Sequence, residues 1–346
     1  MSKVLVTESN LQNIATAIRE KNGSSDTYTP SQMATAITNI PSGGGGTDWT
    51  DVGYNSEPNG ISIIHNKAKS IYDSWDSSIT SAMNKFYRNR DIVIFPMVDT
   101  SNINNTVYGM FQDCTGLVEF PALTMSPTST QNMFSGCFAL KKVDVSNMNF
   151  ENCYSCNRMF YSCGWLKGTV DFGSKEIKVT QSVEFNSMFE GCSDIENIVF
   201  FKMSPRNSDY GMNLNSAFYS CINLKTIDFN NIQYYQKVNY MNQTFRGCSS
   251  LTSLDLSKLK STSYLTNCQG TFANCNKLET LDISGIDLTQ ITSYSNMFSN
   301  VGSQLSSGTY TTVYVKDTAS QTWLLNLGSS DRPSGWTTAN VIVKGN

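Results

Sequence analysis

A short motif, Phe-x-x-Cys-x-x-Leu, is repeated along most of the chain and is compatible with few folds. The phenylalanines lie 23 to 29 residues apart, and the first seven copies have Cys and then Leu or Ile at the same spacing. An eighth copy has Val301 in the Cys position. Self-similarity at such a period is typical of a solenoid, in which each repeat packs on its neighbours. The eight phenylalanines are Phe111, Phe134, Phe160, Phe189, Phe218, Phe245, Phe272 and Phe298.

Each motif is followed by a few residues that alternate between apolar and polar, as in Leu254-Asp255-Leu256. This period of two predicts a β-strand with one face inside and one face outside. One strand per repeat is too sparse for a sandwich or a propeller blade. We therefore predict an α/β leucine-rich-repeat solenoid with a single parallel sheet, one strand per turn, and Ser- and Asn-rich segments that return the chain.

The remaining segments differ in character from the repeats. Two short amphipathic helices, each preceded by a capping box, are too small to form a core alone and are followed by a Gly-rich linker. An end repeat would expose its core, so we expect a cap at each end of the array. The expected segments are residues 1–41 (two-helix docking module), 42–47 (linker), 48–100 (N-terminal cap), 101–301 (leucine-rich repeats) and 302–346 (C-terminal cap).

Apolar residues on one face of the two N-terminal helices require a partner surface. We expect this module to dock on other chains of a larger assembly. The residues that form this face are Leu11, Ile14, Ile18, Met33 and Ile37.

The caps are predicted from periodicity and capping residues. At the N-terminal end we expect one helix through Ile61, Ile64, Ala68 and Ile71, a second through Ile79, Met83 and Phe86, and a strand over residues 91–95. At the C-terminal end we expect strands over residues 312–315 and 340–343, with a helix between them that Asp317 begins and Gly328 ends.

The repeat unit resembles the BspA-type, or treponemal, leucine-rich repeats of bacterial surface proteins and some phage proteins. The best matches run from Thr244 to Ser257 and from Thr271 to Ser284, and the resemblance covers roughly the repeat region. The Phe160 copy departs from it by an extra residue before the strand, and the Phe111 copy has Pro121 in the strand. The segment from Thr7 to Ile37 resembles N-terminal modules of virion proteins from phages of Gram-positive bacteria.

Cysteine is the most conspicuous residue type, with ten copies. The pair Cys153-x-x-Cys156 is typical of a redox or metal site, but the chain has one histidine and no second pair at that spacing. The alternative is that the cysteines are small buried hydrophobes, which pack in a column with one thiol per turn. We favour the second interpretation and predict reduced thiols, no disulfides and no metal site.

One polar column recurs at the outward position of the strands. Its functional interpretation is a ligand face for sugar hydroxyls, a basic partner or a cation. The alternative is that carboxylates keep the sheet surface soluble and bond to neighbouring Ser, Thr or Asn. The residues of this column are Asp144, Asp171, Asp228, Asp255 and Asp282.

Other chemistry finds little support. Charged residues make up 15% of the chain, the net charge is −3, and the absence of a Lys/Arg run argues against nucleic-acid binding. His65, the only histidine, has no nucleophile motif beside it, and Gly43–Gly46 does not continue as a phosphate-binding loop. We expect no enzymatic activity and no cofactor, although a pair of carboxylates of the glycosidase type has no sequence signature that would reveal it.

Two functional hypotheses remain. The first is a phage tail, baseplate or fibre component, made in a bacterial cytoplasm, without a signal peptide or membrane insertion. Residues 1–41 would bind other virion proteins, and the repeats would bind a host surface protein or glycan. Such fibre components favour a homo-oligomer, in particular a trimer. The second is a bacterial adhesin of the BspA type, and neighbouring genes would separate the two.

Overall fold

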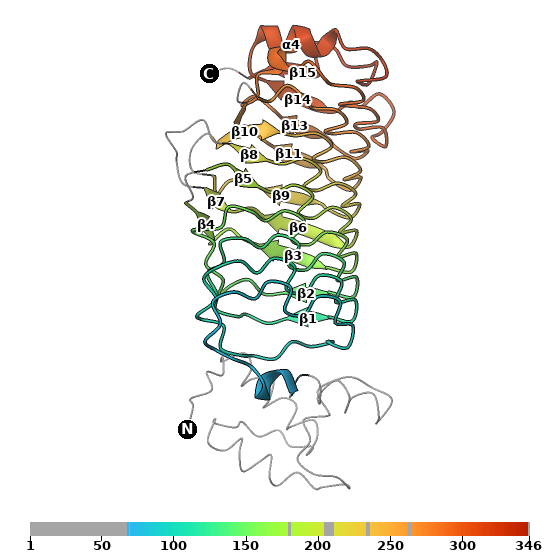
Figure 1. Ribbon diagram of the computed structural model, residues 1–346. Helices are drawn as coiled ribbons and strands as arrows, with labels where there is room; N and C mark the ends of the chain where they lie inside the picture. Colours follow the sequence, from blue (N-terminus) through green and yellow to red (C-terminus); the bar gives the residue numbers. More distant parts are fainter. Residues whose placement is uncertain are drawn as a thin grey trace, which may run out of the picture. The chain divides into compact units, whose positions relative to one another are not determined.

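The computed structural model describes residues 68–344, apart from residues 69, 179–180, 204–210, 233–235 and 262–263. The chain separates into two compact units, Met1–Asn66 and Lys67–Asn346. The second unit is a parallel β-solenoid with little helix (Figure 1). Each circuit of its chain is called a coil here and is named by its phenylalanine. Within the described ranges, no helix combines the length and the apolar character that a membrane span requires.

One side of the solenoid carries the strands that follow the Phe motif, and we call it the main sheet face (Figure 1). The strands pair in parallel as β1-β2, β3-β6-β9 and β11-β13-β14-β15. In the Phe160 coil, Gly168 has a φ of +71°, and the register between β3 and β6 shifts between Gly168 and Thr169. The strands are β1 (Glu119–Phe120), β2 (Lys142–Val143), β3 (Gly168–Asp171), β6 (Ile195–Val199), β9 (Thr226–Asp228), β11 (Ser253–Asp255), β13 (Thr280–Asp282), β14 (Thr312–Val315) and β15 (Val341–Val343).

The expectation of a single sheet with one strand per turn is wrong. The returning segments also pair in parallel, as β4-β7 and as β12-β10-β8-β5. Stacked coils bring every segment beside its counterpart in the next coil, so extended stretches pair wherever they occur. These strands are β4 (Glu176–Ile177), β7 (Lys202–Met203), β5 (Val183–Glu184), β8 (Met212–Asn213), β10 (Gln236–Tyr240) and β12 (Leu259–Ser261).

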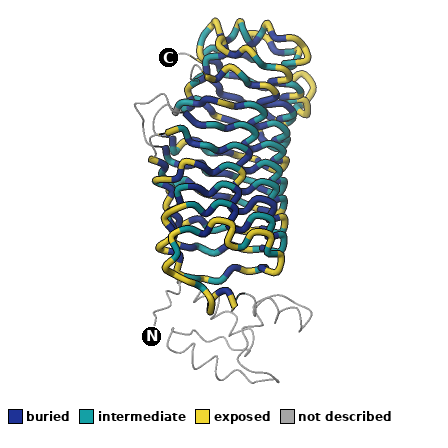
Figure 2. The backbone as a smooth tube through the Cα atoms, viewed as in Figure 1, coloured by how far each residue is buried: buried dark blue, intermediate teal, exposed yellow. Residues whose placement is uncertain are grey.

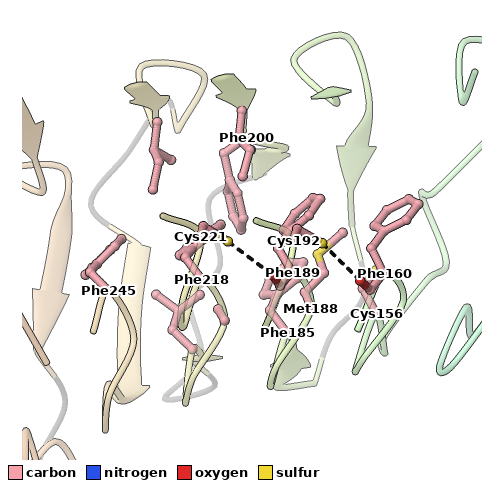
Figure 3. Close-up of a cluster of buried hydrophobic side chains, with 14 of the residues drawn as sticks. Cys156, Phe160, Phe185, Met188, Phe189, Cys192, Phe200, Phe218, Cys221 and Phe245 are labelled. Atoms are coloured by element: carbon pink, nitrogen blue, oxygen red, sulfur yellow. Dashed lines mark hydrogen bonds between the residues drawn. The ribbon is translucent and has the colours of Figure 1, made fainter. Parts of the chain in front are cut away.

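The phenylalanines of the motif form a continuous column through the core. Neighbouring rings are stacked with centroids 5.2 to 5.9 Å apart and interplanar angles of 4° to 15°. Figure 2 shows the buried positions recurring along the coils, and Figure 3 shows part of the column around Phe189. The rings therefore align successive coils, because each coil contributes one ring at the equivalent position in the stack.

The backbone of the Phe motif forms overlapping turns rather than a strand. Some N–H groups donate within the coil, as Cys137 does to the Phe134 carbonyl (3.0 Å), while intervening ones donate to the next coil, as Phe134 does to Met159 (2.8 Å). This alternation requires positive φ two residues before and two after each phenylalanine, for example 56° at Asn132 and 76° at Gly136. Gly, Asn and Ser recur there because side chains with short or absent branches tolerate this region best.

The cysteines of the motif form a second column, beside the phenylalanines (Figure 3). Each of the seven thiols donates to the backbone carbonyl of the phenylalanine in the preceding coil, with S···O distances of 3.0 to 3.2 Å. Six of these carbonyls also accept the N–H of the cysteine in their own coil, and the Phe86 carbonyl accepts that of Asn89. The expectation of a buried cysteine column is confirmed. Each thiol gives a buried carbonyl a second hydrogen bond, which a plain hydrophobe such as Val301 in the eighth copy cannot supply.

The helix expected through Ile79, Met83 and Phe86 is wrong. Residues 82–88 repeat the turn geometry of the other coils, with φ of 52° at Asn84 and 58° at Arg88. Phe86 stacks on Phe111 at 5.3 Å and extends the phenylalanine column by one ring. The sequence pattern hid this coil because its Cys position holds Asn89. Of the other expected N-terminal elements, residues 70–73 are helical and Ile94 forms a parallel bridge with Glu119.

The C-terminal cap agrees closely with expectation. Strands β14 and β15 flank α4 (Thr318–Leu325), and the Asp317 side chain accepts the Ser320 N–H at its N-terminus. The helix ends at Leu325 rather than at Gly328, and a short 3-10 helix, η1 (Leu288–Gln290), precedes the last coil. Asp331 accepts the two N–H groups that the Phe298 coil would otherwise donate to a further coil. Its carboxylate accepts the Asn296 N–H (2.7 Å), and its carbonyl accepts the Phe298 N–H (2.8 Å).

Candidate functional site

The main sheet face brings the aspartates of the predicted column into one row. Asp255 lies opposite Asp282 in the register of β11 and β13, and Val199 of β6 lies between Asp171 and Asp228. Asp171 and Asp255 are exposed, whereas Asp144 and Asp228 are half-buried. Strand spacing in a sheet is about 4.8 Å, so adjacent carboxylates repel one another unless a partner lies nearby.

Each aspartate of the column has a local structural role. Its Oδ1 atom accepts the backbone N–H of the residue two positions later, at 2.7 to 3.0 Å, where the chain leaves the strand. This turn motif explains why Asp is preferred at the end of each strand. Among the described residues, no hydrogen bond or ion pair engages the second oxygen of Asp144, Asp171, Asp228 or Asp255. Their role as a ligand face stays a prediction.

Asp282 differs from the other four. It is only 7% exposed, and its Oδ2 atom pairs with the Lys344 ammonium beyond β15. The hydrogen bond to Asp282 raises the pKa of Lys344 above its ordinary value. The C-terminal segment therefore covers and neutralises this carboxylate. The accessible aspartates of the column are those of the preceding coils.

Beside the aspartates runs a second outward row, made of hydroxyl and amide side chains, two residues earlier in each strand. Within it, Thr226 donates to Asn197 (2.8 Å) and Asn197 donates to Thr169 (3.4 Å). The row lies in register across the strands. Donors and acceptors at regular spacing beside carboxylates form a flat polar surface suited to a polyhydroxylated ligand. Its members are Thr169, Asn197, Thr226, Ser253, Thr280 and Thr312.

The seven motif cysteines lack the features of a reactive site, and Cys153 and Cys156 form a separate buried pair. All ten are free thiols and all are buried. Burial raises the pKa of Cys114, Cys268 and Cys275 to about 12, which keeps these thiols protonated. The Sγ atoms of Cys153 and Cys156 lie 3.7 Å apart, and the hydrogen bond from Cys156 lowers the pKa of Cys153. Over the ranges that the structure describes, no cluster of His, Cys, Asp or Glu could hold a metal ion.

The docking-module candidates Leu11, Ile14, Ile18, Met33 and Ile37, and also His65, lie outside the described residues. Two groups were missed from the sequence. One is a pair of exposed aromatic rings at a corner of adjacent coils, Phe138 (54% exposed) and Trp165 (56%). The other is a polar cavity in the C-terminal cap, of about 480 Å³, that includes Arg332. Two large aromatic residues just after a motif cysteine are a signal that the sequence offered, and a Ser- and Gly-rich composition marks the cap loops.

Comparison with known protein families identifies a match over most of the described chain. No curated protein matches the chain. A protein family described as "Mycoplasma protein of unknown function, DUF285" matches residues 82–201 and 212–321, and its first segment begins at the Phe86 coil. These segments include the repeats and the main sheet strands from β1 to β14, and the second segment ends within α4. The chain therefore belongs to the DUF285 family of Mycoplasma proteins of unknown function.

Proposed function

We propose that this chain is an interaction protein whose solenoid presents the main sheet face to a partner. The observation that carries the proposal is the row of Asp171, Asp228 and Asp255 beside a parallel row of hydroxyl and amide groups. The core accounts for the phenylalanines and cysteines, but in the described part of the chain each of these three aspartates uses only one oxygen for the turn that follows it. The partner that fits is a host surface protein or glycan with several hydroxyl or cationic groups.

For its location, we propose a phage virion, in a tail, baseplate or fibre. Residues 1–41 would attach the chain to other virion proteins through their apolar helix faces, and the repeats would be of the BspA leucine-rich type. A trimer is the favoured oligomeric state. The support is the resemblance of the N-terminal segment to virion modules and the Gly-rich linker that follows it.

A bacterial adhesin outside any virus is the second candidate. The observation that favours it is the membership of the DUF285 family, whose description names Mycoplasma proteins. Mass spectrometry of purified virions and of the cell-surface fraction separates the two locations. Deletion of residues 1–41 should abolish incorporation into virions under the first proposal and leave surface display unchanged under the second.

The recognition role is tested with two double variants at Asp228 and Asp255. The change of both to Asn keeps an oxygen that accepts the turn N–H but removes the charge, whereas the change of both to Ala removes both. We expect both variants to lose binding to host cells, but only the Ala variant to lose thermal stability. Full binding by a folded Asn variant would show that the charges do not recognise the partner.

A further inference from the structure

A second binding site lies in the C-terminal cap, away from the aspartate row. Two loops, residues 302–310 and 329–335, line an open cavity of about 480 Å³ beside the last coil. Pockets of roughly 300–1,000 Å³ are the size class that holds small ligands. The cavity wall is rich in small hydroxyl residues, including Ser306, Ser307 and Ser330, and Arg332 is its only charged residue.

Arg332 is held in place but its charge has no counterion. Its guanidinium donates to the backbone carbonyls of Leu325 (2.6 Å), Pro333 (3.0 Å) and Trp336 (3.3 Å). A guanidinium has five N–H donors, so part of its capacity remains unused, and the buried Nε–H has no acceptor. In the described part of the chain Arg332 makes no ion pair, and the Oδ1 atom of neighbouring Asp331 accepts the Asn296 N–H instead.

Tyr310 supplies an aromatic wall. The side chain is 43% exposed, and its ring lies so close to Gly335 that a Cβ added there would be 2.1 Å from the Tyr310 Cε1 atom. Only glycine allows the ring this position. An aromatic face beside hydroxyl groups matches the two sides of a sugar ring, with its apolar C–H face and its polar edge.

We propose that this cavity, which we call the cap pocket, binds a sugar that carries a carboxylate. The fixed positive charge of Arg332 pairs with the carboxylate, the serine hydroxyls contact the sugar hydroxyls, and Tyr310 covers the ring. The site deepens the proposed recognition role and rests on it for the source of the sugar, which would be an acidic glycan of the host surface.

Calorimetry or ligand-observed NMR with the full-length protein tests the pocket without cells. Glucuronate and N-acetylneuraminate carry both ring and charge, glucose carries only the ring, and acetate carries only the charge. We expect at least one acidic sugar to bind at least tenfold more tightly than glucose and acetate, and its binding to weaken as salt is raised. The acidic sugar that binds more tightly indicates which kind of host glycan supplies the ligand. Binding of neither acidic sugar, or equal binding of glucose, would overturn the proposal.

Two variants and a matched control locate the site. Arg332→Gln removes the charge, Gly335→Ala displaces the Tyr310 ring while Arg332 is kept, and Arg246→Gln removes an arginine on a distant coil. We expect a tenfold or greater loss of acidic-sugar binding in the first, a smaller loss in the second and none in the third. If Arg332→Gln fails to fold, Gly335→Ala decides: unchanged affinity there would refute the pocket. Loss of cell binding by the aspartate variants with intact sugar binding would separate the two sites.

Discussion

Replacement of Phe189 by Ala tests the phenylalanine column directly. Phe189 is fully buried and stacks between Phe160 (5.2 Å) and Phe218 (5.9 Å). Removal of a buried phenylalanine ring costs about 3–5 kcal/mol, because the lost burial adds to the cavity left behind. Since each coil touches only its neighbours, we place this substitution near the upper value: both stacked contacts are lost and no other element can fill the space.

The matched control is Phe138→Ala, which removes the same atoms from a side chain that is 54% exposed. Exposed substitutions of this kind usually change stability by no more than about 0.5 kcal/mol. Urea denaturation of both variants gives the two free energies of unfolding, and hydrogen exchange shows whether protection falls first in the coils beside Phe189. A loss below about 1 kcal/mol for Phe189→Ala, or equal losses in both variants, would refute the stacked column.

Two further predictions concern single hydrogen bonds. Thr271→Val should cost about 1 kcal/mol of unfolding free energy in a urea titration. The buried hydroxyl lies 2.8 Å from the carbonyls of Met241 and Cys268 and donates its one proton to them, and valine keeps the shape without this bond; no change would contradict a role for it. Asp317→Ala should destabilise α4 by about 1 kcal/mol. The hydrogen bonds from Ser320 lower the pKa of Asp317 below its ordinary 3.8, so this contribution is present above pH 3.8 and is lost as the pH falls further. The protection of the α4 amides, measured relative to their intrinsic exchange rates, should fall as the pH drops below 3.8. Protection that stays constant over this range would contradict the prediction.

Much of the fold was readable from the sequence because the solenoid repeats one set of contacts. The spacing of Phe and Cys identified the core, the alternation around Asp255 identified the main sheet strands, and Asp317 identified the start of α4. The second set of parallel strands was missed because the returning segments vary in length and share no motif. The Phe86 coil was missed because Asn89 replaces the cysteine, and an end coil is only partly buried.

The candidate site was predictable in part. Period-two alternation placed the aspartates outward, but it cannot show the bond from each carboxylate to the following turn, nor that Lys344 would reach back to Asp282 from 62 residues away. The cap pocket depends on how two loops fold against the last coil. Loop geometry of this kind follows from tertiary packing, so the sequence indicated only the Ser and Gly content of those loops.

The buried thiol column makes the most direct test of the central claim that the repeats stack as a solenoid with their cysteines inside. Native protein is treated with a thiol reagent, and the labelled cysteines are counted by mass spectrometry before and after denaturation. All ten cysteines are free and buried, so we expect almost no labelling of the native protein and close to ten labels after denaturation. Rapid labelling of several motif cysteines in the native protein, or far fewer than ten thiols after denaturation, would contradict the account.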